Sequence, residues 1–280
     1  MTADRTYDAL ILDLDGTVVD FDGQAHPSTV KAIKQAVRSG VRVMVATGRS
    51  EPAALPMLEL LGLDGEASVY NGAAVYSPRE KRLIREFNLS ARVCTTVLEY
   101  AWARNYATVV MSEGMKRTLS PQTEAGRLTV HDMHDLNVVS RREMRVQRTI
   151  RISLFSDQHS SSGAFAGEIK ALLEDPVLLT HFPLNVLPNH HDSTLLMLDV
   201  HPDCRGKAEA LAWLEEQHGI PPERVVAVGD AANDLTMLSD AGLGVCMEES
   251  VEEVRAVSDR VIGPCRSDTI AHLIEELFFQ

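Results

Sequence analysis

The stretch DALILDLDGTVVD, residues 8–20, constrains the fold of this 280-residue chain more than any other. Its apolar run, Ala9 to Leu12, is short and uninterrupted, which is typical of a strand buried on both faces of a parallel sheet. Asp13 and Asp15 follow at once, and residues two apart in an extended segment point the same way. A fold keeps two like charges side by side only with a cation or a shared proton. Asp-Gly is also ordinary turn chemistry, so the interpretation depends on the rest of the chain.

Three further apolar runs are each followed by polar side chains. These are Val41 to Ala46 before Thr47, Gly48 and Arg49; Ser68 to Tyr70 before Asn71; and Val225 to Val228 before Asp230, Asn233 and Asp234. Helical patterns separate the first three runs, and this β-α-β-α-β order predicts a doubly wound α/β domain with a parallel sheet. Such sheets bind ligands beyond the carboxyl ends of their strands, so we expect the polar side chains to converge at one edge.

Between the third and fourth of these runs the pattern is less regular. Helices are predicted at Ser90 to Arg104 and Gly163 to Leu173, and strands at Ala107 to Met111, Thr149 to Phe155 and Ser193 to Val200. Apolar and polar residues alternate in the strands, which predicts an antiparallel sheet with helices on one face, an α+β domain. We therefore expect a core domain of residues 1–80 and 196–280, closed by a helix at Thr269 to Phe278. The inserted domain covers residues 81–195, and the charged segment Arg79 to Arg85 is expected to be a linker.

Composition argues against several kinds of partner. The chain has 27 Lys and Arg against 40 Asp and Glu, a formal net charge of -13, with no Lys/Arg-rich block. Nucleic acid and anionic membrane surfaces are therefore not expected partners. No apolar run approaches the roughly 20 residues of a membrane span. The segment Met1 to Tyr7 is polar, so we expect no signal peptide. The cysteines form no CxxC pair, which favours a reduced, cytoplasmic protein.

The polar clusters together suit a metal and a phosphate. Clustered Asp and Asn oxygens are ligands for a hard cation such as Mg²⁺, and no Cys or His joins them as zinc would require. Mg²⁺ usually binds one or two carboxylates together with substrate phosphate. Thr47 and Lys207 are suitable phosphate donors. The set predicts phosphoryl transfer, in which positioning and charge neutralisation dominate.

Four segments resemble the four motifs of the haloacid dehalogenase superfamily. They are Asp13-Leu14-Asp15-Gly16-Thr17, Thr47-Gly48-Arg49, Lys207, and Gly229-Asp230-Ala231-Ala232-Asn233-Asp234. The position of the inserted domain resembles that of type C2 caps, and Asn71-Gly72-Ala73 is similar to the Cof-type hydrolases. The resemblance implies a Rossmann-like core with a C2 cap. The chain has Gly206-Lys207-Ala208 where the family often has Lys followed by Gly.

The resemblance also implies roles for individual residues. Asp13 is the expected nucleophile, forming an aspartyl-phosphate, and Asp15 the acid that protonates the leaving oxygen and later deprotonates water. Thr47, Gly48 and Lys207 are expected to hold the phosphoryl group. Mg²⁺ is expected on Asp13, the backbone carbonyl of Asp15, and Asp230. Asn233 and Asp234 are expected to support the metal or Lys207, with Arg49 and Asn71 as further supporting residues.

Three functions remain open at this point. The first is a Mg²⁺-dependent phosphatase acting on a small phosphorylated metabolite, such as a sugar phosphate or a nucleotide-like phosphate. The second is a phosphomutase of the same superfamily, although no Arg-rich motif for a bisphosphate is present in the inserted domain. The third is a non-catalytic phosphometabolite-binding protein, which the intact Asp13 and Asp15 argue against. Arg49 is either a substrate contact or a structural ion pair. His190 and His191 are either surface residues or a further metal or substrate contact.

Overall fold

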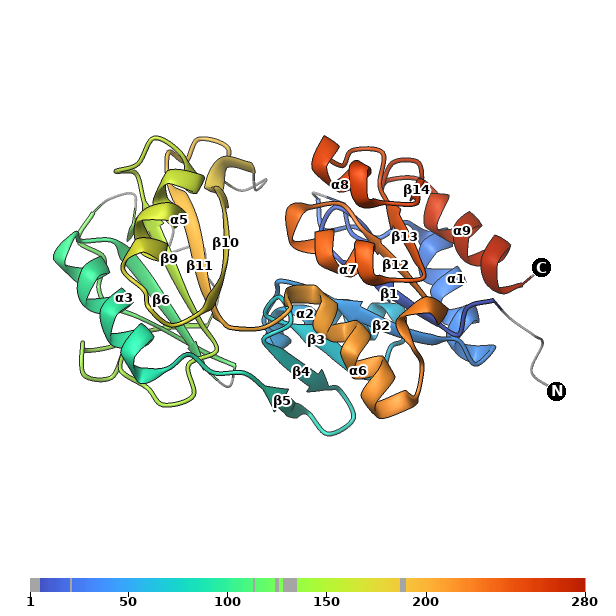
Figure 1. Cartoon of the computed structure of the whole chain (residues 1–280), viewed down its shortest axis with the longest axis horizontal. Coiled ribbons are helices and arrows are strands. Elements are labelled where there is room, and N and C mark those ends of the chain that lie inside the picture. Colours follow the sequence, from blue (N-terminus) through green and yellow to red (C-terminus); the bar gives the residue numbers. More distant parts are fainter. Residues whose placement is uncertain are drawn as a thin grey trace. The chain divides into compact units, whose positions relative to one another are not determined.

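The computed structural model of the chain describes residues 6–20, 22–112, 114–123, 126–127, 135–186 and 190–279. The chain divides into two compact units (Figure 1): unit 1 is Met1–Arg85 with Arg205–Gln280, and unit 2 is Glu86–Cys204. An α/β unit is thus interrupted in sequence by a second unit. The chain passes from unit 1 to unit 2 after Arg85 and returns at Arg205. Both positions lie later in the chain than the expected boundaries, which were after residue 80 and before residue 196.

Unit 1 is built on a mostly parallel sheet. Its strands, in chain order, are β1 (Ala9–Leu12), β2 (Arg42–Ala46), β3 (Ala67–Val69), β4 (Ala74–Ser77), β5 (Arg82–Glu86), β12 (Val225–Gly229), β13 (Leu243–Cys246) and β14 (Arg260–Val261). They lie in the order β14-β13-β12-β1-β2-β3-β4-β5. β1 pairs in parallel with β2 and β12, β2 with β3, and β12 with β13, whereas β4 is antiparallel to β3. This order confirms the predicted doubly wound α/β core.

Helices form two groups in unit 1. They are α1 (Pro27–Arg38), α2 (Glu51–Leu61), α6 (Glu209–His218), α7 (Leu235–Asp240), α8 (Glu252–Val257) and α9 (Thr269–Phe278). α1 packs on α2 and α9, while α7 packs on α6 and α8. Ala9 and Ile11 of β1 share an apolar cluster with Leu211 of α6 and Met237 of α7. Side chains alternate along a strand, so Leu10 projects to the opposite face, and both faces of β1 are buried.

The charged segment expected to be a linker is part of the core sheet instead. β4 and β5 form the edge beyond β3, and β5 contains Arg82 and Arg85 on either side of Leu83 and Ile84. Charged side chains are common on edge strands, because they discourage pairing with another chain. The charged residues of this segment therefore belong to an exposed edge strand of the core sheet.

Unit 2 is an α+β unit. Its strands are β6 (Ala107–Ser112), β7 (Met115–Thr118), β8 (Leu136–Val138), β9 (Arg151–Ser156), β10 (Val177–Pro183) and β11 (Leu196–Pro202), in the order β10-β11-β9-β6-β7-β8. All neighbours pair antiparallel except β7 and β8. The helices α3 (Ala91–Ala103) and α5 (Ser162–Ala171) cover one face, where Val97 and Phe165 share an apolar cluster with Ile152.

β11 belongs to unit 2, where the sequence pattern placed a strand at Ser193 to Val200, although the boundary at residue 196 assigned most of that strand to the core. It pairs with β9 and β10 along its length, for example Leu198 with Leu154 and with His181. The chain returns to unit 1 at Arg205, immediately before Lys207.

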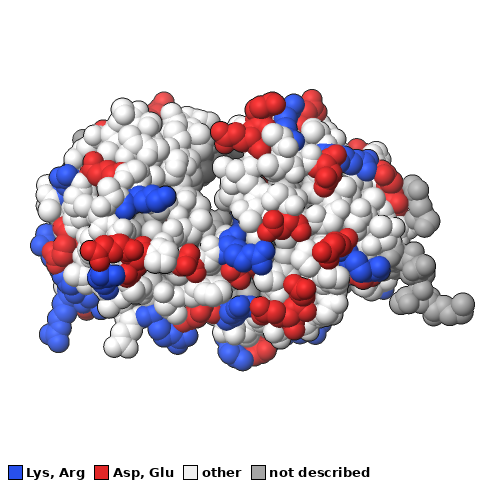
Figure 2. All heavy atoms as spheres, viewed as in Figure 1, with Lys and Arg blue, Asp and Glu red and all other residues white. Residues whose placement is uncertain are grey.

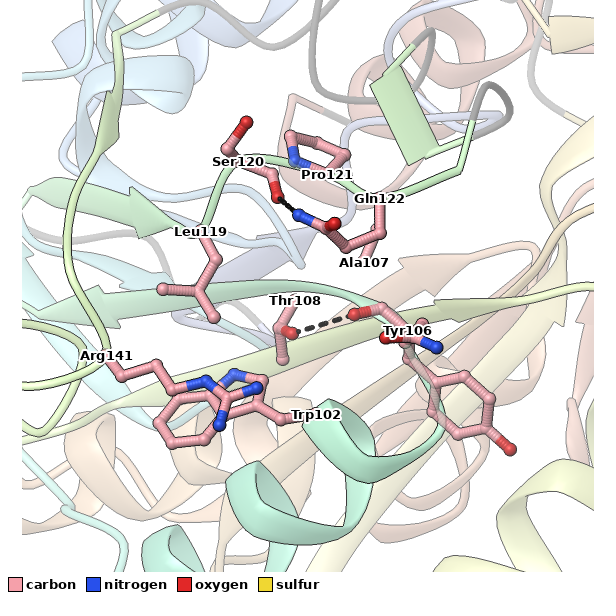
Figure 3. A pocket seen from close by; sticks show the side chains of 10 residues that line it. Trp102, Tyr106, Ala107, Thr108, Leu119, Ser120, Pro121, Gln122 and Arg141 are labelled. Carbon is pink, nitrogen blue, oxygen red and sulfur yellow. Dashed lines mark hydrogen bonds between the residues drawn. The ribbon is translucent and has the colours of Figure 1, made fainter.

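Unit 2 contains a cavity of about 320 Å³ beside the end of α3 (Figure 3). Ala107 and Thr108 of β6, the segment Leu119–Gln122 and Arg141 line it together with Trp102. The guanidinium of Arg141 lies across the indole of Trp102, 5.2 Å from the ring centroid. This cation–π contact lies in the lining of the cavity.

The surface carries charges of both signs. Figure 2 shows acidic and basic side chains interspersed over the face drawn there. Many form ion pairs, such as Arg79 with Asp64 at 2.8 Å and Arg260 with Glu276 at 2.8 Å. Among the described residues, no helix combines the length and apolar character needed to cross a bilayer.

Candidate active site

The predicted polar side chains converge at the carboxyl edge of the parallel strands in unit 1. Asp13 follows β1, Thr47 follows β2, Asn71 lies two residues after β3, and Asp230 follows β12. These strands are neighbours in the sheet and run parallel, so their ends meet. Lys207 reaches the same edge from the short 3₁₀ turn Gly206–Ala208 that precedes α6.

Lys207 is buried between two carboxylates. Its Nζ donates hydrogen bonds to Oδ1 of Asp13 at 2.6 Å and to Oδ1 of Asp234 at 2.7 Å. Lys207 is 2% exposed and Asp13 3%. Burial by itself lowers the pKa of Lys207, but the two carboxylates outweigh this effect and hold the pKa above its ordinary value. The lysine is therefore a fixed positive charge.

Three carboxylates gather around this lysine. Among the described residues, Asp13, Asp230 and Asp234 form a group whose ligand oxygens all lie within 4.8 Å of one another. Burial raises the pKa of Asp13 well above its ordinary value; Lys207 lowers it in part, and the other two carboxylates raise it further. Burial, followed by the charge of Asp234, raises the pKa of Asp230 to about 6. One ammonium does not balance three carboxylates, so the group fits a cation.

Both oxygens of the Asp234 carboxylate accept hydrogen bonds. Its Oδ1 accepts from Lys207, and its Oδ2 accepts the N–H groups of Asp230 at 3.1 Å and Ala231 at 3.0 Å. Gly229 makes room for this carboxylate, because a Cβ there would lie 2.5 Å from Cγ of Asp234. Asp234 thus orients Lys207 and the loop, which leaves Asp13 and Asp230 as the better ligands for a cation.

Asp15 is directed toward Arg49 rather than into the acidic group. Arg49 donates from Nε to Oδ2 of Asp15 at 2.9 Å and from Nη2 to Oδ1 at 2.6 Å, a bidentate pair. These hydrogen bonds raise the pKa of Arg49 against the opposing effect of burial. The Asp15 side chain is 60% exposed. Of the two roles considered for Arg49, the ion pair is the one that the structure contains.

Thr47 and Asn71 lie on adjoining loops. The Thr47 hydroxyl is fully buried and accepts the N–H of Arg49 at 3.1 Å. Asn71 accepts a hydrogen bond at Oδ1 from Nδ2 of Asn233, at 3.0 Å. Gly48 lies against the same amide, since a Cβ there would be 3.0 Å from Oδ1 of Asn71. The structure thus brings together every predicted site residue of unit 1.

Thr17, to which sequence reasoning assigned no role, and Gly16 both lie against Asp230. Thr17 donates from Oγ1 to Oδ1 of Asp230 at 3.2 Å. Gly16 has a left-handed φ of +84°, and a Cβ there would lie 2.4 Å from Oδ2 of Asp230. Both residues lie inside the first motif, whereas Asp230, which they contact, lies 213 residues beyond Thr17 in the chain. His190 and His191 lie in unit 2, outside the acidic group.

Comparison with known proteins identifies the family. A family model described as haloacid dehalogenase-like hydrolase matches residues 10–274. The chain belongs to the haloacid dehalogenase-like hydrolases. One such relative is the HMP-PP phosphatase of Serratia proteamaculans (strain 568), 30% identical over 273 residues, covering 96% of this chain and 94% of that protein.

Two further proteins extend the comparison. The chloroplastic endoribonuclease YBEY of Arabidopsis thaliana is 26% identical over 268 residues. The match covers 92% of this chain but 44% of that protein, so this chain spans less than half its length. The crystal structure of a haloacid dehalogenase-like hydrolase from Bacteroides thetaiotaomicron superposes with a TM-score of 0.80 at 21% identity. It covers 97% of this chain and 100% of that one, and it agrees with the observed fold.

Proposed function

We propose that this hydrolase is a Mg²⁺-dependent phosphatase of small phosphorylated metabolites, acting through an aspartyl-phosphate on Asp13. The observation that carries the proposal is the buried contact of Lys207 with Asp13 beside Asp230. A carboxylate held next to a permanent cation suits a nucleophile that must receive a phosphate dianion, because the cation offsets the charge repulsion.

The proposed reaction has two steps. An oxygen of Asp13 forms a bond to phosphorus while the phosphorus–oxygen bond to the leaving group breaks, and Asp15 gives a proton to the departing oxygen. In the second step Asp15 takes a proton from water, whose oxygen attacks phosphorus and releases phosphate and the Asp13 carboxylate. To make both transfers, the exposed Asp15 carboxyl group would have to turn away from Arg49, because both of its oxygens accept hydrogen bonds from that guanidinium.

The remaining residues neutralise charge and position the phosphoryl group. Lys207 and Thr47 hold the phosphoryl oxygens, and Gly48 lets its backbone approach them closely. Asp13 and Asp230 would hold Mg²⁺, together with the backbone carbonyl of Asp15, whereas Asp234 anchors Lys207. When bound, the metal would withdraw charge from the phosphoryl group. The raised pKa of Asp13 and of Asp230 supports this fit, because two carboxylates that resist ionising together favour a cation.

The relatives support the proposed substrate class. The Serratia relative is named for phosphatase activity on HMP-PP, and it matches this chain over nearly its full length. We extend this to a small phosphorylated metabolite, either a sugar phosphate or a nucleotide-like phosphate. Four free cysteines among the described residues suit a reducing compartment, and we propose a cytoplasmic enzyme.

Turnover of p-nitrophenyl phosphate tests the proposal. We expect activity with Mg²⁺, its loss in EDTA, and its recovery when Mg²⁺ is added back. Asp13→Asn should be inactive, whereas Asp64→Asn, which alters an exposed ion pair with Arg79, should keep full activity. Full activity in EDTA or in Asp13→Asn would contradict the mechanism. A panel of phosphorylated metabolites then ranks substrates, and dependence on glucose-1,6-bisphosphate would indicate a phosphomutase instead.

A further inference from the structure

The turn after β3 has an uncommon backbone. Tyr70, Asn71 and Gly72 are consecutive and all left-handed, with φ of 54°, 54° and 86°. Residues other than glycine seldom adopt this conformation, and runs of them persist only where surrounding contacts compensate. Tyr70 is 1% exposed and Asn71 4%, so the turn is buried. The structure therefore keeps a strained turn at the edge of the candidate active site.

The backbone of this turn holds the loop that carries Thr47. The N–H of Asn71 donates to the carbonyl of Thr47 at 3.0 Å, and the N–H of Tyr70 donates to the carbonyl of Arg49 at 2.9 Å. Consecutive left-handed residues direct two neighbouring N–H groups toward that loop. An ordinary extended connection would not present both.

The side chain of Asn71 reaches a different loop. Its Oδ1 accepts from Nδ2 of Asn233, which is 162 residues further along the chain and next to Asp234. This contact uses the nitrogen end of the Asn233 amide, so the oxygen end of that amide points away from Asn71. The same Oδ1 lies 3.0 Å from where a Cβ at Gly48 would be, so Asn71 fits closely between the two loops.

The third residue of the turn meets the segment before Lys207. A Cβ on Gly72 would lie 1.9 Å from the carbonyl oxygen of Gly206, so only glycine fits there without displacement. The turn therefore contacts the threonine loop, the Asn233 loop and the lysine segment, yet it contributes no charged group. Residues that join several loops of a site can set the geometry of reacting groups without touching substrate.

We propose that Asn71 is a positioning residue, which orients the Asn233 carboxamide and ties its loop to the Thr47 loop. The inference rests on the proposed function and deepens it. Asn71 acts through Asn233: without the bridge, the Asn233 amide can rotate and the loop bearing Asp230 loses one of its restraints. Metal binding and the chemical step should then suffer more than substrate affinity.

The test uses four variants, chosen to separate side chain from backbone, and one control variant. Asn71→Gly removes the bridge but accepts the left-handed conformation, whereas Asn71→Ala removes the bridge and adds backbone strain. Asn233→Ala removes the other half of the bridge, and Asn71→Gly/Asn233→Ala removes both. Asn105→Gly is the matched control, since Asn105 is left-handed with φ 58° but is exposed and lies in unit 2.

Kinetics with p-nitrophenyl phosphate give the first readout. Asn71→Gly should lower kcat about tenfold or more while KM changes by less than about twofold. The double variant should be no slower than Asn233→Ala, because each substitution removes the same hydrogen bond between Asn71 and Asn233. Wild-type kcat in Asn71→Gly would overturn the proposal, and so would losses that multiply in the double variant.

Mg²⁺-dependent thermal stabilisation gives a second readout that needs no turnover. Asn71→Gly and Asn233→Ala should require similarly higher Mg²⁺ concentrations than wild type, and Asn105→Gly should not. If wild type hydrolysed no phosphate ester, the proposed function would fail, while this titration would still decide the role of Asn71. Equal Mg²⁺ dependence in wild type and Asn71→Gly would overturn the positioning role.

Discussion

Lys207 donates a hydrogen bond to Asp13 over 2.6 Å, although 194 residues separate them in the chain. Both side chains are almost completely buried. The contact joins the two sequence segments of unit 1 across the insertion. An ion pair in such a place serves the site and the fold together, because removing either partner leaves a buried charge without compensation.

Replacing Lys207 with Met should therefore destabilise the protein. We expect a loss of about 3–5 kcal/mol in the free energy of unfolding at neutral pH, because Asp13 and Asp234 lose their cation. The loss should shrink as pH falls, since Asp13, whose pKa is already raised by burial, takes up a proton in the native state. Urea denaturation measures it, with Lys31→Met on exposed α1 surface expected within about 0.5 kcal/mol of wild type. Equal losses in the two variants would refute the buried pair's role.

The two aspartates of the first motif should fail in different ways. Asp13→Asn should form no phosphoenzyme, because an amide cannot replace the carboxylate nucleophile. Asp15→Asn should slow turnover by about 10²–10⁴-fold, most severely with poor leaving groups. Quench-flow with acid-trapped phosphoenzyme distinguishes them. Phosphoenzyme in Asp13→Asn, or equal losses with good and poor leaving groups in Asp15→Asn, would show that the roles are assigned incorrectly.

Binding of Mg²⁺ should depend on pH through Asp230. Its pKa is raised to about 6 in the metal-free protein, so a proton competes with the metal below that pH. The same shift makes the native metal-free state lose stability as pH rises from the ordinary Asp pKa to about 6, since the unfolded chain releases the proton earlier. Apparent Mg²⁺ affinity, measured by calorimetry, should rise as pH rises through about 6, where Asp230 loses its proton. An affinity independent of pH would contradict this.

Two glycines with similar backbones should respond differently to alanine. Gly72 and Gly23 have φ of +86° and +75°, but a Cβ at Gly72 would meet the Gly206 carbonyl at 1.9 Å, whereas one at Gly23 has no described atom within 4 Å. Gly23→Ala should cost the left-handed penalty of about 1–2 kcal/mol. Gly72→Ala should cost more and should also lower kcat, because the Lys207 segment must move. Denaturation and turnover of both variants check this, and similar behaviour would argue against the close contact.

Much of the fold could be predicted because its signals are local. The apolar runs before Asp13 and Thr47 became β1 and β2, and the helix expected at Thr269 to Phe278 has those bounds. Where prediction failed, the local pattern was ambiguous. The expected boundary at residue 196 falls at the start of β11, which pairs in unit 2, and the charged segment ending at Arg85 joins the sheet edge. Strand partners depend on which surfaces meet, which no short window of sequence contains.

The sequence by itself determined the β-α-β-α-β start of the core, its later strand at Val225 to Val228, and the chemistry available at the strand ends. It did so because a strand buried on both faces requires an apolar run, and a parallel sheet brings the residues after such runs to one edge. Only the tertiary structure decided which polar groups pair: Arg49 with Asp15, Thr17 with Asp230, and Asn71 with Asn233. These contacts join loops distant in sequence, and their geometry depends on the packing that brings the loops within hydrogen-bond reach.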